Sequence, residues 1–181
     1  MDDSYIRDVL NGDTGAFRFL VGKYKNRAYN LARSLVRSDL IAEEATQDAF
    51  VQAFKNLRKF KGKAAFSTWF YRIVVNESLK KNRKKKLQFV GISESEIGET
   101  IPDIYSHAIE PFHEEEQREL IEQVLEKLKE TEALLLKLFY LEEKKIDEIV
   151  EITGLTPSNC KVILFRARKK FAEYYRLKVN Q

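Results

Sequence analysis

The sequence is poor in the residues from which disulfide scaffolds, metal centres and many active sites are built. Cys160 is the single cysteine among the 181 residues, so the chain cannot form an internal disulfide framework. Its two histidines, His107 and His113, lie in one acidic stretch, and no glycine-rich phosphate loop is present. A metal site or an activated nucleophile therefore lacks its usual cluster of side chains. We expect no enzyme activity, no metal and no cofactor.

Long apolar runs are also missing. No run approaches the ~18 consecutive apolar residues needed to span a bilayer, so we expect no membrane insertion. The first residues, Met-Asp-Asp-Ser, lack the basic start and apolar stretch of a secretory signal. The expected location is the cytoplasm.

Glycine and proline are scarce, at 7 and 3 residues, whereas 44% of the chain is hydrophobic. Apolar residues recur with a helical period and not with the alternation of strands, which predicts an all-α fold. Charge divides the chain further: residues 91–117 carry eight carboxylates and no lysine or arginine, between basic stretches at 80–86 and 161–178. We predict two small helical domains, 1–86 and 117–181, joined by a flexible acidic linker at 87–116.

In the first domain the periodicity predicts four helices, near residues 4–11, 15–37, 40–58 and 67–83. A short basic loop, 59–65, precedes the last of them and contains Gly62. The third helix is expected to bury one apolar face, consisting of Ala42, Ala45, Ala49, Phe50, Ala53, Phe54 and Leu57. Thr46, Gln47 and Asp48 turn away from that face and leave a polar surface.

Residues 141–170 have the pattern of a helix-turn-helix that binds DNA. Gly154 stands where a helix end needs a left-handed residue, Thr156 is a good N-cap, and Pro157 suits a first helical position. The second helix is expected to bury Cys160, Ile163, Leu164, Ala167 and Phe171 and to expose Ser158, Val162, Phe165 and Lys169.

The exposed side of that second helix indicates base contacts. Val162 and Phe165 suit thymine methyl groups, and Arg166 suits a guanine edge or a phosphate. Other cations are predicted to neutralise phosphates: Lys161, Arg168, Lys169 and Lys170. The alternative is an ordinary helical hairpin with a solvated basic face.

Three stretches in this order resemble the extracytoplasmic-function (group 4) sigma factors of bacterial RNA polymerase. Residues 42–54 resemble region 2.2 of that family, 60–76 resemble regions 2.3 and 2.4, and the helix-turn-helix unit that ends with 165–170 resembles region 4.2. The resemblance covers nearly everything outside the linker. It implies a protein that binds core polymerase, recognises −35 duplex DNA and opens the −10 element, and that catalyses no reaction itself.

The resemblance also assigns residues to partners. Contact with the β′ clamp helices of core polymerase falls to Glu44, Gln47, Asp48 and Phe50. Capture of the −10 strand falls to Phe60, Lys61, Gly62, Lys63, Ala64, Phe66, Thr68, Trp69, Arg72, Asn76 and Lys80. Recognition of −35 DNA falls to Thr156, Ser158, Asn159, Lys161, Val162, Phe165, Arg166 and Lys169. Part of the aromatic set, Phe66, Phe70 and half of Trp69, is expected to serve packing.

The resemblance also implies further partners, and two rival functions remain open. The β flap would receive the second domain, and the acidic linker would either enter the RNA exit path or act as a plain flexible connection. An anti-sigma factor could cover the polymerase and DNA surfaces. The rivals are a helix-turn-helix regulator that works without polymerase binding and a nucleic-acid enzyme with an accessory binding unit.

Overall fold

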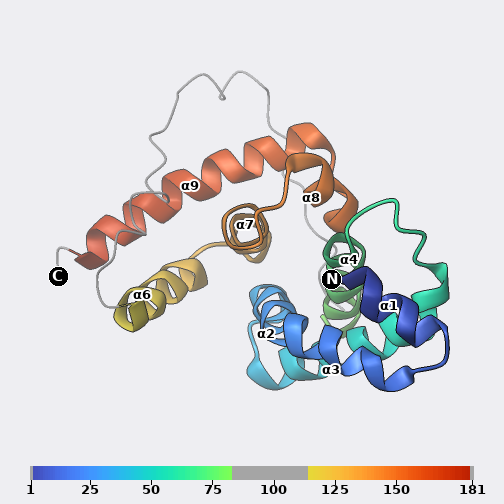
Figure 1. Ribbon diagram of the computed structural model, residues 1–181. Helices are drawn as coiled ribbons and strands as arrows, with labels where there is room; N and C mark the ends of the chain where they lie inside the picture. The colour runs from blue at the N-terminus through green and yellow to red at the C-terminus, as the bar shows by residue number, and fades with distance from the viewer. Residues whose placement is uncertain (1, 83–113, 180–181) are drawn as a thin grey trace. The chain divides into compact units, whose positions relative to one another are not determined.

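The computed structural model describes residues 2–82 and 114–179, with side chains from 118 onward in the second range. Every regular element in these ranges is helical, which confirms the all-α prediction. The chain forms two compact units, Met1–Lys86 with Glu151–Gly154, and Leu87–Val150 with Leu155–Gln181 (Figure 1). Most of the predicted linker lies outside the described residues.

The N-terminal unit is built on three long helices that pack against one another, α2, α3 and α4. A shorter helix, α1, and the 3₁₀ turn η1 precede them. Gly12 ends α1 in a left-handed conformation, with φ of 110°, which explains the break predicted there. The elements are α1 (Asp2–Leu10), η1 (Thr14–Ala16), α2 (Phe17–Val36), α3 (Asp39–Asn56), η2 (Leu57–Lys59) and α4 (Phe66–Lys81).

Helix α3 presents a strip of small residues to its neighbours. Ala42, Ala45, Ala49 and Ala53 are fully buried, so the helix backbones can approach closely. Large rings fill the rest of the core: Phe70 and Tyr71 of α4 are fully buried. Phe54 departs from its predicted place on the buried face. It lies at the last turn of α3 and is 41% exposed.

The C-terminal elements are arranged around one long helix, α9. Figure 1 shows α6 and α7 along the same side of α9, and both pack against it. Buried leucines of α7 and the rings and alkyl groups of α9 form the core there. The elements are α6 (Glu114–Lys127), α7 (Glu130–Leu136), η4 (Lys137–Leu141, a turn of π-helix), α8 (Ile146–Thr153) and α9 (Pro157–Val179).

Candidate nucleic-acid interface

One side of α4 is free of the core and carries polar and aromatic side chains in register. Trp69, Arg72, Asn76 and Lys80 follow one another at helical spacing, and all but the half-buried Trp69 are exposed. These are four of the residues predicted to line the −10 strand. The opposite side of α4 contains the buried Phe70 and its neighbours, which fix the rotation of the helix.

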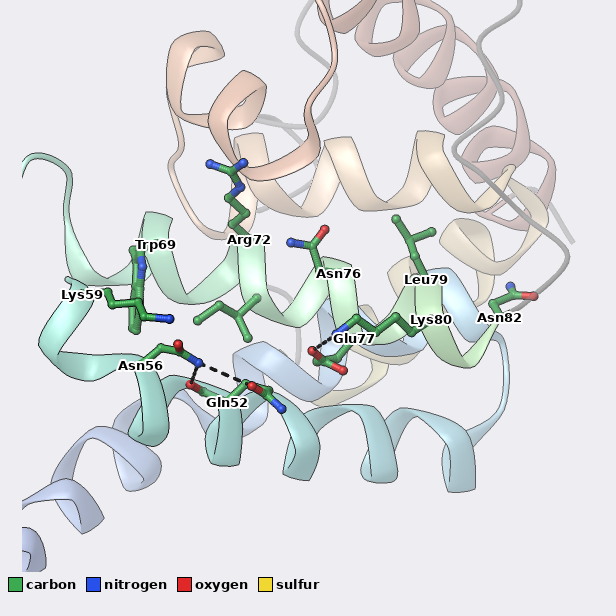
Figure 2. A pocket seen from close by; sticks show the side chains of 11 residues that line it. Gln52, Asn56, Lys59, Trp69, Arg72, Asn76, Glu77, Leu79, Lys80 and Asn82 are labelled. Carbon is green, nitrogen blue, oxygen red and sulfur yellow. Dashed lines mark hydrogen bonds and ion pairs between the residues drawn. The ribbon is translucent and has the colours of Figure 1, made fainter.

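A groove of about 670 Å³ runs between this side of α4 and the end of α3. Figure 2 shows Gln52 and Asn56 on α3 facing the side chains of α4 across it. Asn56 Nδ2 donates to the main-chain oxygen of Gln52 at 2.9 Å and to its side-chain Oε1 at 3.4 Å, so the two amides lie together at the groove. Sequence reasoning missed these two residues, because no spacing within one helix shows which residues of another helix face it.

The mouth of the groove lies beside three aromatic rings. Phe60 is 5.4 Å from Trp69 and 5.7 Å from Phe66, measured between ring centroids. Phe66 is 4% exposed and stacks on Phe70, so it belongs to the core. Phe60 and Trp69 are partly exposed and keep ring surface available for stacking.

The loop before α4 supplies positive charge. Lys59, Lys61 and Lys63 are exposed, Ala64 is partly so, and Gly62 adopts a left-handed conformation with φ of 66°. At the other end of the groove Lys80 Nζ lies 2.6 Å from Glu77 Oε1 and stays largely exposed. The groove thus has cations at both ends.

Thr68 corrects the prediction for this site. Its side chain is fully buried, and its main-chain nitrogen donates to Ala65 O at 3.0 Å in the first turn of α4. It faces the core because it lies one position before Trp69 on the helix, and the helical period turns it inward. Phe66 is also buried in the core, in agreement with the packing role expected for it.

The predicted polymerase surface on α3 is mixed. Glu44 and Gln47 are exposed, and Asp48 is partly exposed. Phe50, in contrast, is 9% exposed, and its ring centroid lies 4.6 Å from that of Phe70. Phe50 therefore supports the helix from inside instead of meeting a partner. Thr46, expected to turn away from the core, is buried and donates to Ala42 O at 2.7 Å.

Lys81 of α4 joins the acidic residues of that surface. Its Nζ lies 2.8 Å from Asp48 Oδ2 and 3.3 Å from Glu44 Oε2. The hydrogen bonds to Asp48 and then Glu44 raise the pKa of Lys81 above its usual value, so the ammonium keeps its charge. The two carboxylates are consequently held in a fixed arrangement on the surface.

Exposed apolar side chains accompany these acids on α3. Leu40 is 67% exposed and Val51 is 48% exposed. Together with Glu44 and Gln47 they occupy positions i, i+4, i+7 and i+11, which form one stripe on the helix. We call Leu40, Glu44, Gln47 and Val51 the α3 stripe. Its two apolar members were absent from the predicted set, although helical spacing alone could have added them.

The turn between α8 and α9 has the geometry that the sequence predicted. Gly154 is left-handed with φ of 74°, and Leu155 is 2% exposed. Thr156 Oγ1 accepts a hydrogen bond from the main-chain nitrogen of Asn159 at 3.2 Å, and Pro157 is the first residue of α9. The N-cap therefore satisfies one of the free N–H groups at the start of the helix.

Helix α9 buries four of the five residues predicted for its core face, and three residues depart from their predicted exposure: Ile163 is only partly buried, and Val162 and Phe165 are only partly exposed. The four buried residues are Cys160, Leu164, Ala167 and Phe171. On the predicted reading side, Thr156, Ser158, Lys161 and Lys169 are exposed and Asn159, Val162, Phe165 and Arg166 are partly exposed.

Two cations predicted to contact phosphates are instead engaged within the protein. Lys170 Nζ lies 2.6 Å from Glu132 Oε1 of α7. The guanidinium carbon of Arg168 lies 5.1 Å from the centre of the Phe139 ring and 5.4 Å from that of Tyr140. Both residues lie on the flanks of α9, where neighbouring elements reach them.

Within residues 2–82 and 114–179 there is no group of three or more His, Cys, Asp or Glu side chains able to hold a metal ion. No helix in these ranges is long and apolar enough to cross a bilayer.

Comparisons with known proteins agree with this arrangement. The family model for Sigma-70 region 2 matches residues 20–88, and that for Sigma-70 region 4 matches 118–171, together more than half of the chain. The chain is 29% identical to the ECF RNA polymerase sigma factor SigW of Bacillus subtilis, covering 94% of this chain and 95% of that one. It is also 29% identical to the ECF sigma-E factor of Escherichia coli K12, covering 93% and 91%.

Solved structures share the fold. The complex of CnrH with the cytosolic domain of CnrY matches with a TM-score of 0.64 at 19% identity, covering 98% of this chain and 97% of the other. The complex of the sigma factor RpoE with the anti-sigma factor NepR from Bartonella quintana also gives 0.64, at 18% identity, covering 91% and 98%. With both sigma regions in order along a helical chain, this protein belongs to the ECF sigma factors of RNA polymerase.

Proposed function

We propose that the protein binds core RNA polymerase and directs promoter-specific initiation, recognising −35 duplex with α9 and opening the −10 element with α4. One observation carries the proposal. The side of α4 that bears Trp69, Arg72, Asn76 and Lys80 lines a groove with cations at both ends. A helix face of this kind suits a single strand, which needs stacking surface and charge neutralisation together.

The −10 strand would run along this groove. Flipping a base out of the duplex costs a few kcal/mol, and stacking on an aromatic side chain returns ~1–3 kcal/mol per base. Phe60 and Trp69 offer partly exposed rings for that purpose, and Lys61 and Lys63 lie on the loop beside them. Arg72 and Lys80 would neutralise the strand's phosphates farther along α4.

The −35 duplex would receive α9 in its major groove. The helix begins with a satisfied N-cap, so its first turn is rigid where base contacts are made. Val162, Phe165 and Arg166 then form a reading side of two apolar groups and one cation. Lys161 and Lys169 are exposed beside them and would bind phosphates.

Core polymerase would bind the α3 stripe. Its apolar members, Leu40 and Val51, give the contact an area to bury, and Glu44 and Gln47 between them give it polarity. We infer that the β′ clamp helices occupy this surface. Most of the acidic linker lies outside the described residues, and its passage through the RNA exit path stays a prediction. The division into domains 1–86 and 117–181 stays a prediction as well.

The β flap has a candidate place in the C-terminal unit. A groove of about 250 Å³ lies between α6 and the end of α9, with Val124 and Tyr174 in its lining. Leu177 at its edge is 58% exposed, and Lys127 and Lys178 flank it. An apolar helix or loop tip from the flap would cover these residues.

An anti-sigma factor is a further proposed partner. Both structural relatives described above were solved with such a protein or with a cytosolic domain of a second protein bound. The α3 stripe and the reading side of α9 are the exposed surfaces that such a partner would cover. We place the protein in the cytoplasm, where polymerase and promoter DNA are found.

The deciding experiment mixes the protein with core polymerase and genomic DNA and maps the transcript starts. We expect starts that depend on the protein and share upstream sequences at −35 and −10. If no start rises above the core background, while the protein alone footprints a DNA site tightly, a helix-turn-helix regulator is the right interpretation. Loss of starts from a promoter with a scrambled −35 element would identify the part that α9 reads.

A further inference from the structure

Arg168 of α9 has an unusual environment for a cation on a DNA-binding helix. Its guanidinium lies over two aromatic rings, 5.1 Å from the centre of Phe139 and 5.4 Å from that of Tyr140. The two rings meet each other edge to face at 5.0 Å and 72°. Arg168 Nε is buried and has no hydrogen-bond partner within the described ranges. The side chain is therefore held by stacking.

The two rings reach Arg168 from η4, the turn of π-helix that follows α7. The main-chain nitrogen of Glu142 donates to Lys137 O at 3.0 Å, a spacing of five residues that marks the wider turn. A wider turn rotates successive side chains by a smaller angle, so two neighbours can face the same helix. Leu138, between the start of the turn and the rings, is fully buried and anchors it.

A buried Nε disfavours a phosphate contact. A side-on bidentate contact with a phosphate would use Nε–H together with a terminal N–H, whereas here Nε is buried and the guanidinium carbon lies over the Phe139 and Tyr140 rings. The neighbouring Lys169 is exposed and is placed for phosphate binding. Arginine suits the stacked position because its planar and weakly hydrated group covers an aromatic face, and a lysine ammonium does not.

We propose that Arg168 is a positioning residue for −35 recognition, which locks the rotation of α9 against the π-helical turn and does not bind DNA. Phe165 and Arg166 lie three and two residues before it on α9. A rotation of α9 about its own axis would move Phe165 and Arg166 away from the base edges of the −35 duplex. The proposal rests on the proposed function, because it assigns the means by which α9 keeps its reading side turned to the duplex.

The test measures binding of holoenzyme to the mapped promoter over a series of salt concentrations. Three variants are compared: Arg168→Lys, which keeps charge but loses the planar stack, Arg168→Met, which loses both, and Lys169→Gln as the matched exposed cation. Each protein is measured on the intact promoter and on one with a scrambled −35 element. Wild-type preference for the intact promoter establishes −35 recognition first. If the wild-type protein shows no such preference, the proposed function itself is contradicted, and the role of Arg168 is contradicted with it.

For a positioning residue, both Arg168 variants lose about tenfold in preference for the intact −35 element, while the salt slope stays at the wild-type value. Lys169→Gln lowers the slope by about one unit, as loss of one phosphate contact does. An unfolded C-terminal unit would lower the slope in the Arg168 variants as well, since Lys161 and Lys169 would leave the backbone.

The opposite pattern overturns the proposal. If Arg168→Lys binds like wild type and Arg168→Met lowers the slope by about one unit, Arg168 contacts a phosphate. A second comparison uses Phe139→Leu. In that background Arg168→Met is expected to cost little more preference, because the stack has already been removed. Full additivity of the two losses would show that the rings and the guanidinium act separately.

Discussion

Lys170 Nζ lies 2.6 Å from Glu132 Oε1, and this ion pair connects one flank of α9 to the first turn of α7. The other carboxylate oxygen, Oε2, accepts a hydrogen bond from the main-chain nitrogen of Lys129 at 3.0 Å. The Glu132 side chain is only 8% exposed, whereas that of Lys170 is 38% exposed. One buried carboxylate thus accepts a hydrogen bond at the start of α7 and holds α9 through Lys170.

Glu132→Gln should lower the free energy of unfolding of the C-terminal unit by roughly 1–3 kcal/mol, since it breaks a partly buried charged pair. The exposure of Lys170 places the expected value toward the lower end of that range. Urea unfolding followed by circular dichroism measures it. Glu173→Gln, which changes an exposed acid on α9, is the control and should change stability by less than about 0.5 kcal/mol. Equal effects from both variants would contradict a structural role for Glu132.

The sequence predicts best what is decided within a few consecutive residues. Gly154, Thr156 and Pro157 each satisfy a local need of the backbone, and the structure has all three in the predicted roles. The family resemblance assigns Trp69 and Asn76 to the −10 strand, and the helical period places both on one face of α4. Neither prediction requires knowledge of the neighbouring helices.

The wrong predictions concern side chains whose environment is set by another helix, distant in the sequence. Arg168 and Lys170 were assigned to phosphates because both are cations on a DNA-reading helix, but residues from 132 to 140 reach back to them. Phe54 was placed in the core because it continues an apolar strip, yet at the last turn of α3 only part of its ring is covered, by Phe17, and 41% stays exposed. The α3 side of the groove likewise depends on how two helices cross.

Thr156→Ala should destabilise the start of α9 by about 1 kcal/mol, because the Asn159 N–H loses its side-chain acceptor. Thr156→Ser keeps the acceptor and should restore most of that loss. Thermal unfolding compares the three proteins. If alanine and serine behave alike, the hydroxyl does not stabilise the start of the helix as a cap.

Phe50 and Gln47 should separate stability from polymerase binding. Phe50→Ala removes a buried ring that packs on Phe70 and should cost about 3 kcal/mol of unfolding free energy. Gln47→Arg changes an exposed side chain of the α3 stripe and should leave stability within about 0.5 kcal/mol while weakening core binding at least tenfold. Urea unfolding and titration of labelled protein with core polymerase give the two values. Unchanged core affinity in Gln47→Arg would move the polymerase contact off this stripe.

Asp2 should make the docking of α1 depend on pH. It accepts hydrogen bonds from Lys23 Nζ at 2.6 Å and from the Tyr24 hydroxyl at 2.5 Å. Burial alone would raise the pKa of Asp2, but these bonds and the charge of Lys23 outweigh it, so the folded pKa lies below the ordinary 3.8. The stabilisation is therefore complete above that value and is lost as the pH falls through the lower, folded one.

Asp2→Asn removes the ionised acceptor, and at pH 7 we expect a loss of about 1 kcal/mol and faster amide exchange in α1. The difference between wild type and variant should narrow below about pH 4, where the Asp2 carboxyl of the unfolded wild-type chain begins to protonate. Hydrogen exchange at several pH values measures both proteins side by side. A difference that widens in acid would reverse the sign of the Asp2 contribution.

Asn76 and Trp69 should separate capture of the −10 strand from packing. Asn76 is exposed in the groove of α4, so Asn76→Ala should leave the melting temperature unchanged while slowing promoter opening at least tenfold. The ring centroid of Trp69 lies 5.4 Å from that of Phe60 and 5.6 Å from that of Phe66. Trp69→Ala should therefore lower both the melting temperature and the rate of promoter opening. Trp69→Phe keeps an aromatic surface and should recover part of the stability and part of the rate of opening.

Permanganate reactivity of −10 thymines reports promoter opening, and titration with core polymerase is the control. Because polymerase is proposed to bind α3, core affinity should persist in all three variants; a matching loss of core affinity would mean that the α4 face supports the fold or the polymerase contact and does not capture bases.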